Sequence, residues 1–388
     1  MLTKILMILS YFKYQFGRRE SNRIIFMGYA CKKYNFNTKY LFEYIIKNNP
    51  EFECYFIIDD KDLRNKLNCS IGNFFISRSS LADLKLIFQA GTWITPGGLP
   101  IRIPYVGYKR VVMNLWHGIP IKGIGIYNHE NNWIQNVLIK FIYSKFDSYS
   151  STSELFQQIM SKSFNVDYEK SPILGQAWND QLYKTHDKLE IINKLFRNQI
   201  DVNYDTKLIL YAPTWRNDKN TVLFPFKDFS VQELDYFLEK NNAYIFLRTH
   251  QLDRGSFNCE YSKRIRNLNE DKVVDIMEIL NIFDILVSDY SGIYMDYLLL
   301  DRPIILLPYD LEDYTSTRYL NMDYKYFSTG VEPNTFKEFK RKIQELIKEP
   351  KITSEQARLK ELTHLWKDGN SCERHVDYLN RLIKTKLK

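Results

Sequence analysis

The chain has 388 residues, of which 45% are hydrophobic and 26% are charged. This length is sufficient for two domains with full cores, and the 28 Tyr, 25 Phe and 6 Trp residues exclude a disordered chain. The formal net charge of +8 favours an anionic partner, which could be nucleic acid, an anionic membrane surface or a phosphorylated substrate. The alternative interpretation is that this positive charge serves only to keep the protein soluble.

The five cysteines lie far apart and form no C-x-x-C pair, so the sequence predicts neither a disulfide framework nor a zinc site. We expect no metal ion, no cofactor and a reducing, cytosolic setting. No run of 18 apolar residues is present, so no transmembrane helix is expected.

Residues 1–19 are expected to form an amphipathic helix. The apolar side chains that fall on one face of this helix are Leu2, Ile5, Leu6, Leu9, Phe12 and Phe16. Lys4 interrupts the apolar segment and no small-residue cleavage site follows, which argues against a signal peptide. The helix is predicted to lie on a membrane surface or on the protein's own surface.

Strand-like and helix-like segments alternate from residue 23 onwards. In the first half, the predicted strands are 23–29, 54–59, 92–95, 111–115, 148–152 and 173–175, and the predicted helices are 38–49, 79–90 and 131–146. The apolar stripe of 131–146 is interpreted as a core-facing surface. A polar segment, 184–205, joins the two halves and contains a predicted helix at 188–198.

The second half repeats this alternation. Its predicted strands are 207–211, 244–247, 284–288 and 303–307, and its predicted helices are 231–241, 273–281, 293–300, 335–348, 354–366 and 372–387. Such a pattern indicates βαβ units and parallel sheets. We therefore predict an α/β fold with two Rossmann-like, doubly wound parallel-sheet domains, 20–185 and 186–388, that face a cleft.

The most informative stretch of the first half is 111–125. Its apolar run stops at Trp116-His117-Gly118, and open α/β sheets bind their ligands just outside such strand ends. His117 is therefore a candidate proton acceptor, with Lys122 close behind it. A structural hydrogen bond is the alternative role for this histidine.

Polar clusters follow four predicted strands of the second half, and they begin at Tyr211, Leu247, Val287 and Pro308. In the third cluster a helix begins near Ser291-Gly292, where backbone N–H groups and the helix dipole favour a phosphate. Asp296, one turn later, could reach a ribose hydroxyl. Ordinary N-capping by Ser291 is the alternative.

Arg216, Arg248 and His250 are expected to add positive charge beside this phosphate site. Phosphoryl transfer depends mainly on positioning the phosphates and neutralising their charge. The sequence contains neither G-x-x-x-x-G-K-[ST] nor G-x-G-x-x-G, which argues against a P-loop nucleotidase or a dehydrogenase.

With these clusters, the sequence resembles the CDP-glycerol glycerophosphotransferase family of teichoic acid and capsule polymer biosynthesis. The resemblance is carried by LWHGIPIKGIG, YAPTWR, LRTH, SDYSGIYMDYLLLDRPIILLPYDLEDY and DGNSCERHVDYL. It implies a GT-B-like fold and transfer of glycerol phosphate from CDP-glycerol to a hydroxyl group, with release of CMP. It also implies a membrane prenyl-diphosphate-linked saccharide or growing polymer as acceptor, and a peripheral location on the cytoplasmic face of the cell membrane.

The motifs also imply roles for individual residues, with His117 and His250 as the catalytic ones. The implied donor-binding residues are Gly118, Ile119, Pro120, Ile121, Pro213, Thr214, Arg216, Arg248, Thr249, Ser291, Gly292 and Asp296. The sequence departs from the family pattern at Gly292, where a second Ser is usual, and at Trp178, where an Arg is usual. Ser328-Thr-Gly330 also replaces the usual Pro-Gly-Pro.

Three alternatives remain beside this resemblance. The first is a phosphotransferase that uses CDP-ribitol or another CDP-alditol, and the second is a GT-B glycosyltransferase that uses a nucleotide sugar. The third is a non-catalytic protein that binds a membrane or nucleic acid, which the Arg and His clusters at strand ends disfavour. Nucleic acid is disfavoured further because the basic residues are spread out and no recognition motif is present.

Overall fold

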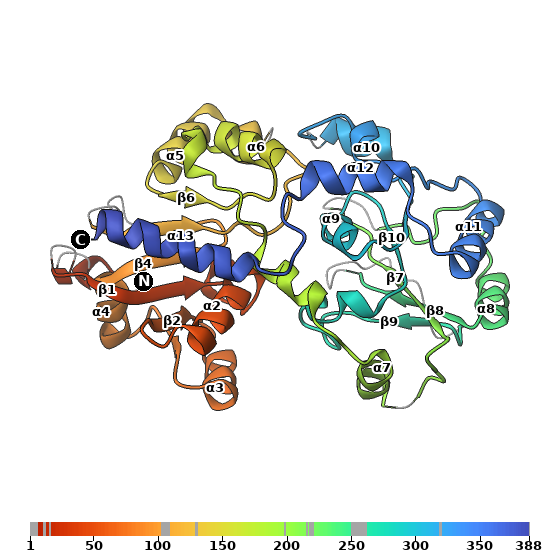
Figure 1. The fold of residues 1–388 in the computed structure, drawn as a ribbon, viewed down its shortest axis with the longest axis horizontal. Coiled ribbons are helices and arrows are strands. Elements are labelled where there is room, and N and C mark those ends of the chain that lie inside the picture. The colour runs from red at the N-terminus through yellow and green to blue at the C-terminus, as the bar shows by residue number, and fades with distance from the viewer. Residues whose placement is uncertain are drawn as a thin grey trace. The chain divides into compact units, whose positions relative to one another are not determined.

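The structure is a computed structural model that describes residues 7–10, 13–14, 17–101, 109–128, 131–197, 199–214, 216, 221–249, 262–317 and 320–387. The chain forms two compact units, each built on its own sheet (Figure 1). Unit 1 comprises Met1–Gly118, Ile124–Asp180 and Asp368–Lys388, and unit 2 comprises Ile119–Gly123 and Gln181–Lys367. The predicted division placed 119–123 in the first domain and 368–388 in the second, so the chain changes units more often than expected.

Unit 1 contains a six-stranded parallel sheet with the order β3-β2-β1-β4-β5-β6. The strands are β1 (Glu20–Met27), β2 (Glu53–Ile57), β3 (Phe75–Ile76), β4 (Ala90–Thr95), β5 (Val111–Asn114) and β6 (Ser148–Tyr149). The described α-helices are α2 (Phe36–Asn48), α3 (Lys61–Ser70), α4 (Leu81–Gln89), α5 (Trp133–Tyr143), α6 (Glu154–Phe164) and α13 (Ser371–Lys386). The strand order reverses between β1 and β4, and ligands of such sheets bind near this switch point.

Unit 2 contains a five-stranded parallel sheet with the order β11-β10-β7-β8-β9. The strands are β7 (Lys207–Tyr211), β8 (Ala243–Leu247), β9 (Ile265–Asn267), β10 (Ile285–Ser288) and β11 (Ile304–Leu306). The described α-helices are α7 (Lys188–Phe196), α8 (Val231–Lys240), α9 (Ile293–Tyr297), α10 (Leu311–Thr317), α11 (Phe336–Lys348) and α12 (Ser354–Thr363). The switch point lies between β7 and β10. Two parallel α/β sheets confirm the predicted fold class.

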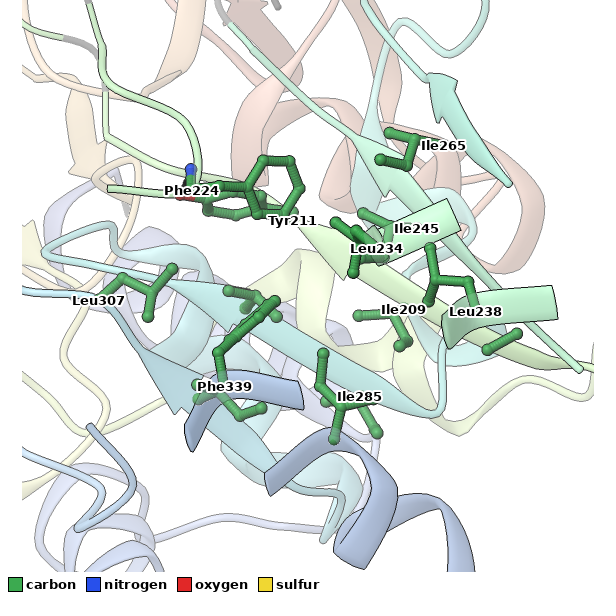
Figure 2. Packing of buried hydrophobic residues seen from close by; sticks show 14 of the residues in the cluster. Ile209, Tyr211, Phe224, Leu234, Leu238, Ile245, Ile265, Ile285, Leu307 and Phe339 are labelled. Carbon is green, nitrogen blue, oxygen red and sulfur yellow. Dashed lines mark hydrogen bonds between the residues drawn. The ribbon is translucent and has the colours of Figure 1, made fainter. Parts of the chain in front are cut away.

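The core on one face of the unit 2 sheet is shown in Figure 2. Ile209 and Tyr211 lie two positions apart on β7, so their side chains share one face of the sheet and both point into this core. Leu234 and Leu238 lie one turn apart on α8, and Phe339 comes from α11. Burial of each such side chain stabilises the fold by about 1.5–3 kcal/mol.

The C-terminal helix α13 belongs to unit 1, where it contacts α2 and β5 (dark blue in Figure 1). The Asp180 carboxylate accepts hydrogen bonds from the N–H groups of Ser371 and Cys372, both at 2.8 Å, and so fixes the start of this helix. His375 is fully buried, with Nδ1 at 2.7 Å from the Ser371 carbonyl oxygen and Nε2 at 2.8 Å from Ser150 Oγ. The contacts of Asp180 with Ser371 and of His375 with Ser150 join residues 191 and 225 positions apart in the chain, which explains why the predicted division missed them.

The predicted helix 273–281 is wrong. This segment forms two short 3-10 turns, Ile276–Glu278 and Leu280–Ile282, instead of an α-helix. The predicted strand at 173–175 makes a single bridge, Ser151 to Ile173. Most apolar residues of these two segments are buried or half-buried, but Val274 is exposed.

The core-facing interpretation of the 131–146 stripe is also wrong. Helix α5 has no buried residue, and Trp133 is 75% exposed. The other apolar side chains left exposed on it are Ile134, Val137, Leu138, Phe141 and Ile142. The helix is held by contacts with α6 and the 3-10 turn η2 (Gly125–Tyr127), and by a capping box of Asn132 and Gln135.

The predicted amphipathic helix 1–19 lies mostly outside the described residues. Within it, residues 7–10 and 13–14 are helical. Among the helices that the structure describes, none is both long and apolar enough to cross a membrane.

Two buried histidines predict a loss of stability in acid. Desolvation lowers the pKa of His364 in unit 2 and of His375 in unit 1 to about 4, whereas an unfolded histidine titrates near about 6.5. Between these values the unfolded chain binds more protons, so the free energy of unfolding falls as the pH falls, by up to about 3 kcal/mol per histidine. Denaturant unfolding between about pH 7 and 4 should show this slope. His364→Gln and His375→Gln should each flatten it, and an unchanged slope in both variants would contradict the assignment.

Candidate active site

The turn after β5 holds His117 at the carboxyl edge of the unit 1 sheet. The φ angle is 55° at Trp116 and 128° at Gly118, so the backbone turns sharply on both sides of the histidine. Such a φ is unfavourable for Trp and has to be imposed by its surroundings. Asn114, buried at the end of β5, accepts a hydrogen bond from the Trp116 N–H at 2.9 Å.

Asn37 of α2 holds the same turn from another side. Its Nδ2 donates to the carbonyl oxygens of Leu115 and Trp116, at 3.3 and 3.2 Å. Its Oδ1 accepts from the Trp178 N–H at 3.1 Å. Asn37 is fully buried and lies 78 residues from Leu115 in the sequence, so a reading of local motifs missed it.

The protonation state of the His117 ring follows from its partners. Nδ1 lies 2.6 Å from the carbonyl oxygen of Pro96, which follows β4. Because a carbonyl oxygen can only accept, Nδ1 carries the hydrogen, and Nε2 of the neutral ring carries the lone pair. His117 is exposed to solvent, while desolvation by the surrounding protein lowers the pKa of its ring and the hydrogen bond with Pro96 partly offsets this. The neutral ring with an open Nε2 is the form that a general base requires.

Aromatic rings form the walls beside this histidine. The ring centroids of Trp116 and Phe36 lie 4.3 and 5.3 Å from that of His117. Trp178 is buried, and its ring lies 3.8 Å from the point where a Cβ on Gly118 would stand. The position at which the family pattern has Arg therefore supplies an apolar wall in this protein.

In unit 2, hydrogen bonds join the loops that follow β7 and β10, on the two sides of the switch point. The buried Asp289 carboxylate accepts from the N–H groups of Thr214 at 2.7 Å and Tyr290 at 2.6 Å. Ser288 Oγ donates to the Ala212 carbonyl oxygen at 2.7 Å. Thr214 Oγ1 is buried and has no hydrogen-bond partner among the described residues, which marks it as a candidate ligand contact.

Arg216 lies at this edge, as predicted, but two carboxylates surround its guanidinium. Nη2 donates to Asp289 at 3.0 Å, and Nε and Nη2 donate to Asp310, both at 2.9 Å. Burial alone would lower the pKa of Arg216, but the hydrogen bond to Asp310 and the Asp289 charge raise it overall. The expected phosphate-neutralising charge is therefore already balanced inside the protein.

Tyrosines surround the same guanidinium and were not predicted as part of the site. The ring centroids of Tyr290, Tyr309 and Tyr314 lie 5.2–5.4 Å from Arg216 Cζ. Tyr290 and Tyr314 stack at 4.1 Å, and Lys122 Nζ lies 5.3 Å from the Tyr314 centroid. Several Tyr residues follow β10 and β11 in the sequence, and this repetition could have indicated that tyrosines form part of the site.

The start of α9 matches the predicted phosphate site in one respect. Gly292 is the N-cap and no side chain of the described residues caps the first turn, so the alternative role of Ser291 as the N-cap is wrong. A Cβ built on Gly292 would meet a single atom within 4 Å, the Ile119 carbonyl oxygen at 3.8 Å. Asp296, in the first turn, is 3% exposed.

The segment Ile119–Gly123 clusters with unit 2 and lies beside α9. Asn321 holds it, since Nδ2 donates to the carbonyl oxygens of Pro120 at 2.6 Å and Lys122 at 2.8 Å. The Asn321 N–H donates to the Ile121 carbonyl oxygen at 2.9 Å. The predicted donor residues 119–121 and Gly292 are thus brought together in one unit.

The loop after β8 carries Arg248 and Thr249. Arg248 Nη1 donates to the carbonyl oxygens of Leu268 and Val273, at 3.1 and 2.5 Å, and Thr249 Oγ1 donates to Asn269 at 3.2 Å. Burial lowers the pKa of Arg248. Pro213 is half-buried after β7, and His250 lies outside the described residues.

Two units with Rossmann-type parallel sheets, each with polar side chains after its strands at the switch point, define a GT-B-like fold. The chain belongs to the CDP-Glycerol:Poly(glycerophosphate) glycerophosphotransferase family, whose pattern matches residues 10–381. The predicted family is confirmed.

Characterised relatives make teichoic acids. A teichoic acid poly(glycerol phosphate) polymerase of Bacillus spizizenii is 29% identical over 313 residues, which is 76% of either chain. A teichoic acid poly(ribitol-phosphate) polymerase of the same species is 25% identical over 93% of this chain and 56% of its own. The Bacillus subtilis polymerase is longer, and the match covers 39% of it. A variant of the wall teichoic acid polymerase TagF has the same fold, with a TM-score of 0.82 at 19% identity over 100% of this chain and 95% of its own.

The space in front of Gly292 predicts a selective loss of donor binding. The backbone there has φ −60° and ψ −20°, which any residue adopts, so Gly292→Val should leave the unfolding midpoint near that of the wild type. Its side chain should hinder a phosphate at the first turn of α9 and weaken CDP-glycerol binding by about tenfold or more, equivalent to about 1.4 kcal/mol. Calorimetric titration would measure this, with Gly292→Ala expected to have a smaller effect. Normal affinity in the Val variant would contradict the site.

Proposed function

We propose that this protein transfers glycerol phosphate from CDP-glycerol to a hydroxyl group of a membrane prenyl-diphosphate-linked saccharide or of a growing polymer, and releases CMP. The observation that carries the proposal is the orientation of His117, whose Nδ1 is held by Pro96 so that Nε2 is open to accept a proton. An alcohol is a weak nucleophile until its proton is removed, and a positioned base typically contributes about 10²–10⁴-fold.

In the proposed reaction the acceptor oxygen forms a bond to the phosphorus atom that carries glycerol. The bond from this phosphorus to the bridging oxygen breaks, and CMP leaves with the electron pair. Nε2 of His117 takes the hydroxyl proton and later releases it to solvent. His250 is proposed to steady the phosphate under attack.

Unit 2 is proposed to hold the donor. Backbone N–H groups at Ser291 and Gly292 suit a diphosphate because the first turn of α9 has no side-chain cap. Thr214 Oγ1 is a further proposed contact, since a buried hydroxyl that has no partner among the described residues gains from a ligand acceptor. The neighbouring Pro213 and Thr249, the segment 119–121 of the same unit and the Asp296 carboxylate complete the proposed donor site in unit 2. Gly118, in unit 1, is a further proposed donor contact.

A CDP-ribitol donor is the second candidate, because a ribitol-phosphate polymerase is among the relatives. The experiment offers CDP-glycerol, CDP-ribitol and UDP-sugars in turn and identifies the nucleotide released. CMP from CDP-glycerol would support the proposal, and CMP from CDP-ribitol alone would favour the second candidate. UDP would indicate a glycosyltransferase.

We also propose a peripheral position at the cytoplasmic face of the cell membrane, with α5 as a contact surface. Its exposed apolar side chains form a larger surface than isolated exposed residues do, and such surfaces mark interaction sites. Lys140 lies on the same helix, and Lys145 Nζ lies 4.7 Å from the Phe141 ring centroid. Apolar side chains interleaved with ammonium groups suit an anionic membrane surface.

The proposed base predicts a specific kinetic defect. His117→Ala should lower kcat by about 10²–10⁴-fold while CDP-glycerol affinity stays near normal. His250→Ala should lower both. In the wild type, kcat/KM should fall in acid with a midpoint below that of an ordinary histidine, because the pKa of His117 is lowered and protonation inactivates the base. If donor affinity collapses in His117→Ala but survives in His250→Ala, the two roles are reversed.

The membrane proposal predicts that α5 contributes to vesicle binding. Replacing Val137 and Phe141 by Glu removes apolar contact and adds charge repulsion, so cosedimentation with anionic liposomes should fall several-fold. Val274→Glu changes a residue that is 74% exposed in unit 2 and should bind as the wild type does. Deleting residues 1–19 tests the N-terminal segment separately. Equal binding by the α5 variant and the wild type at low and high salt would refute this surface.

A further inference from the structure

Unit 1 contains a pocket of 670 Å³ that none of the residues assigned above lines. It is formed by η2, by α6 and by the loop that follows α6. The side chains with polar groups around it are Tyr127, Gln158, Ser161, Lys162, Asn165, Asp167 and Tyr168. Its volume falls in the range of about 300–1,000 Å³ that is usual for small-ligand sites.

The walls of this pocket are fixed by close backbone contacts. Gly125 has φ 59°, and a Cβ there would stand 2.1 Å from the Ser163 carbonyl oxygen, so only glycine lets η2 lie this close to α6. Asn165 ends α6 with φ 53°. Across this turn the Val166 N–H donates to the Ser161 carbonyl oxygen at 3.1 Å, and Ser161 Oγ donates to the Val166 carbonyl oxygen at 3.0 Å. The pocket is therefore part of the ordered fold.

The lining suits a saccharide better than a phosphate. Tyr127 and Tyr168 are each 43% exposed and present aromatic surface, on which the apolar C–H face of a sugar ring can pack. The amides of Gln158 and Asn165 offer both donors and acceptors to hydroxyl groups. Lys162 is accompanied by Asp167, so the pocket has no excess of positive charge for an anion.

Within unit 1, the pocket lies next to elements that contact both α5 and the turn that carries His117, which makes it a suitable place for the acceptor. The turn η2 contacts both α6 and α5, the helix with the exposed apolar surface. On α6, the Phe164 ring packs at 5.2 Å from that of Trp116, the residue before His117. A single helix thus contributes to the pocket wall and supports the turn that carries the proposed base.

We propose that this pocket binds the saccharide part of the acceptor while the lipid part contacts α5. The proposal rests on the proposed function for the identity of the acceptor. It predicts that the pocket determines KM for the acceptor without affecting the donor. The full-length protein and a short-chain alkyl-diphosphate disaccharide serve as enzyme and acceptor probe.

Tyr168→Ala should raise KM for this acceptor by about tenfold, as loss of a well-packed interface tyrosine typically does. KM for CDP-glycerol should remain at the wild-type value. Tyr168→Phe keeps the ring and should retain the wild-type KM for the acceptor. Tyr236→Ala removes a tyrosine that is 68% exposed on α8 in unit 2 and serves as the matched control. Unfolding midpoints of all variants show whether the fold is kept.

A second measurement does not depend on turnover. The free disaccharide, without lipid, phosphate or CDP-glycerol, should give saturation-transfer NMR signals with the wild type that Tyr168→Ala abolishes. An unchanged KM for the acceptor in a folded Tyr168→Ala variant, or competition by glycerol phosphate but not by the disaccharide, would overturn the proposal. If the wild type turns over no CDP-glycerol, the proposed function fails, and disaccharide binding then decides the pocket on its own.

Discussion

A buried guanidinium between two carboxylates fixes the carboxyl edge of the unit 2 sheet. The Arg216 side chain is 9% exposed and that of Asp289 is 2% exposed, and removing such charges from water costs several kcal/mol per ion. The cost is offset because Asp289 follows β10, Asp310 follows β11 and Arg216 follows β7, three neighbouring strands. Loss of Arg216 would leave two carboxylates uncompensated, which typically costs about 3–5 kcal/mol. Reduced activity in an Arg216 variant would therefore be explained first by disorder at this edge of the sheet, and only then by loss of a phosphate contact.

The partners of Arg216 and Arg248 indicate which positive charge is available to a bound diphosphate. Arg216 is paired with anions, so its field is largely cancelled at a distance. Arg248 is bound by the carbonyl oxygens of Leu268 and Val273, which orient the guanidinium. The charges of Glu270, Asp271 and Asp275 act on Arg248 and raise its pKa against the larger effect of burial, so its charge is partly balanced as well. The proposed donor site therefore relies on the first turn of α9 together with Arg248, and it does not require Arg216 to touch the donor.

The elements that were predicted well are those whose own residues determine them. Every residue of β4 and β5 is buried, because both faces of a parallel sheet are covered, and His117 was proposed as the base because it closely follows β5. The failures come from partners that periodicity does not reveal. The stripe on α5 was identified correctly as apolar, but the sequence does not say what covers it. Asn37 and the Asp310 pairing join segments 78 and 94 residues apart.

None of the residues of α5 is buried, so burial in a core does not stabilise this helix. Other contacts have to keep it folded when no partner is bound. An 11-residue helix is marginal in water, so the capping box of Asn132 and Gln135 and the contacts with η2 and α6 are what hold it. A membrane that covered its apolar face would stabilise α5, and through η2 it would stabilise the wall of the saccharide pocket as well. Membrane contact and acceptor binding would then be linked with equal effect in both directions. The exposed helix, which costs stability in solution, would gain its function from that linkage.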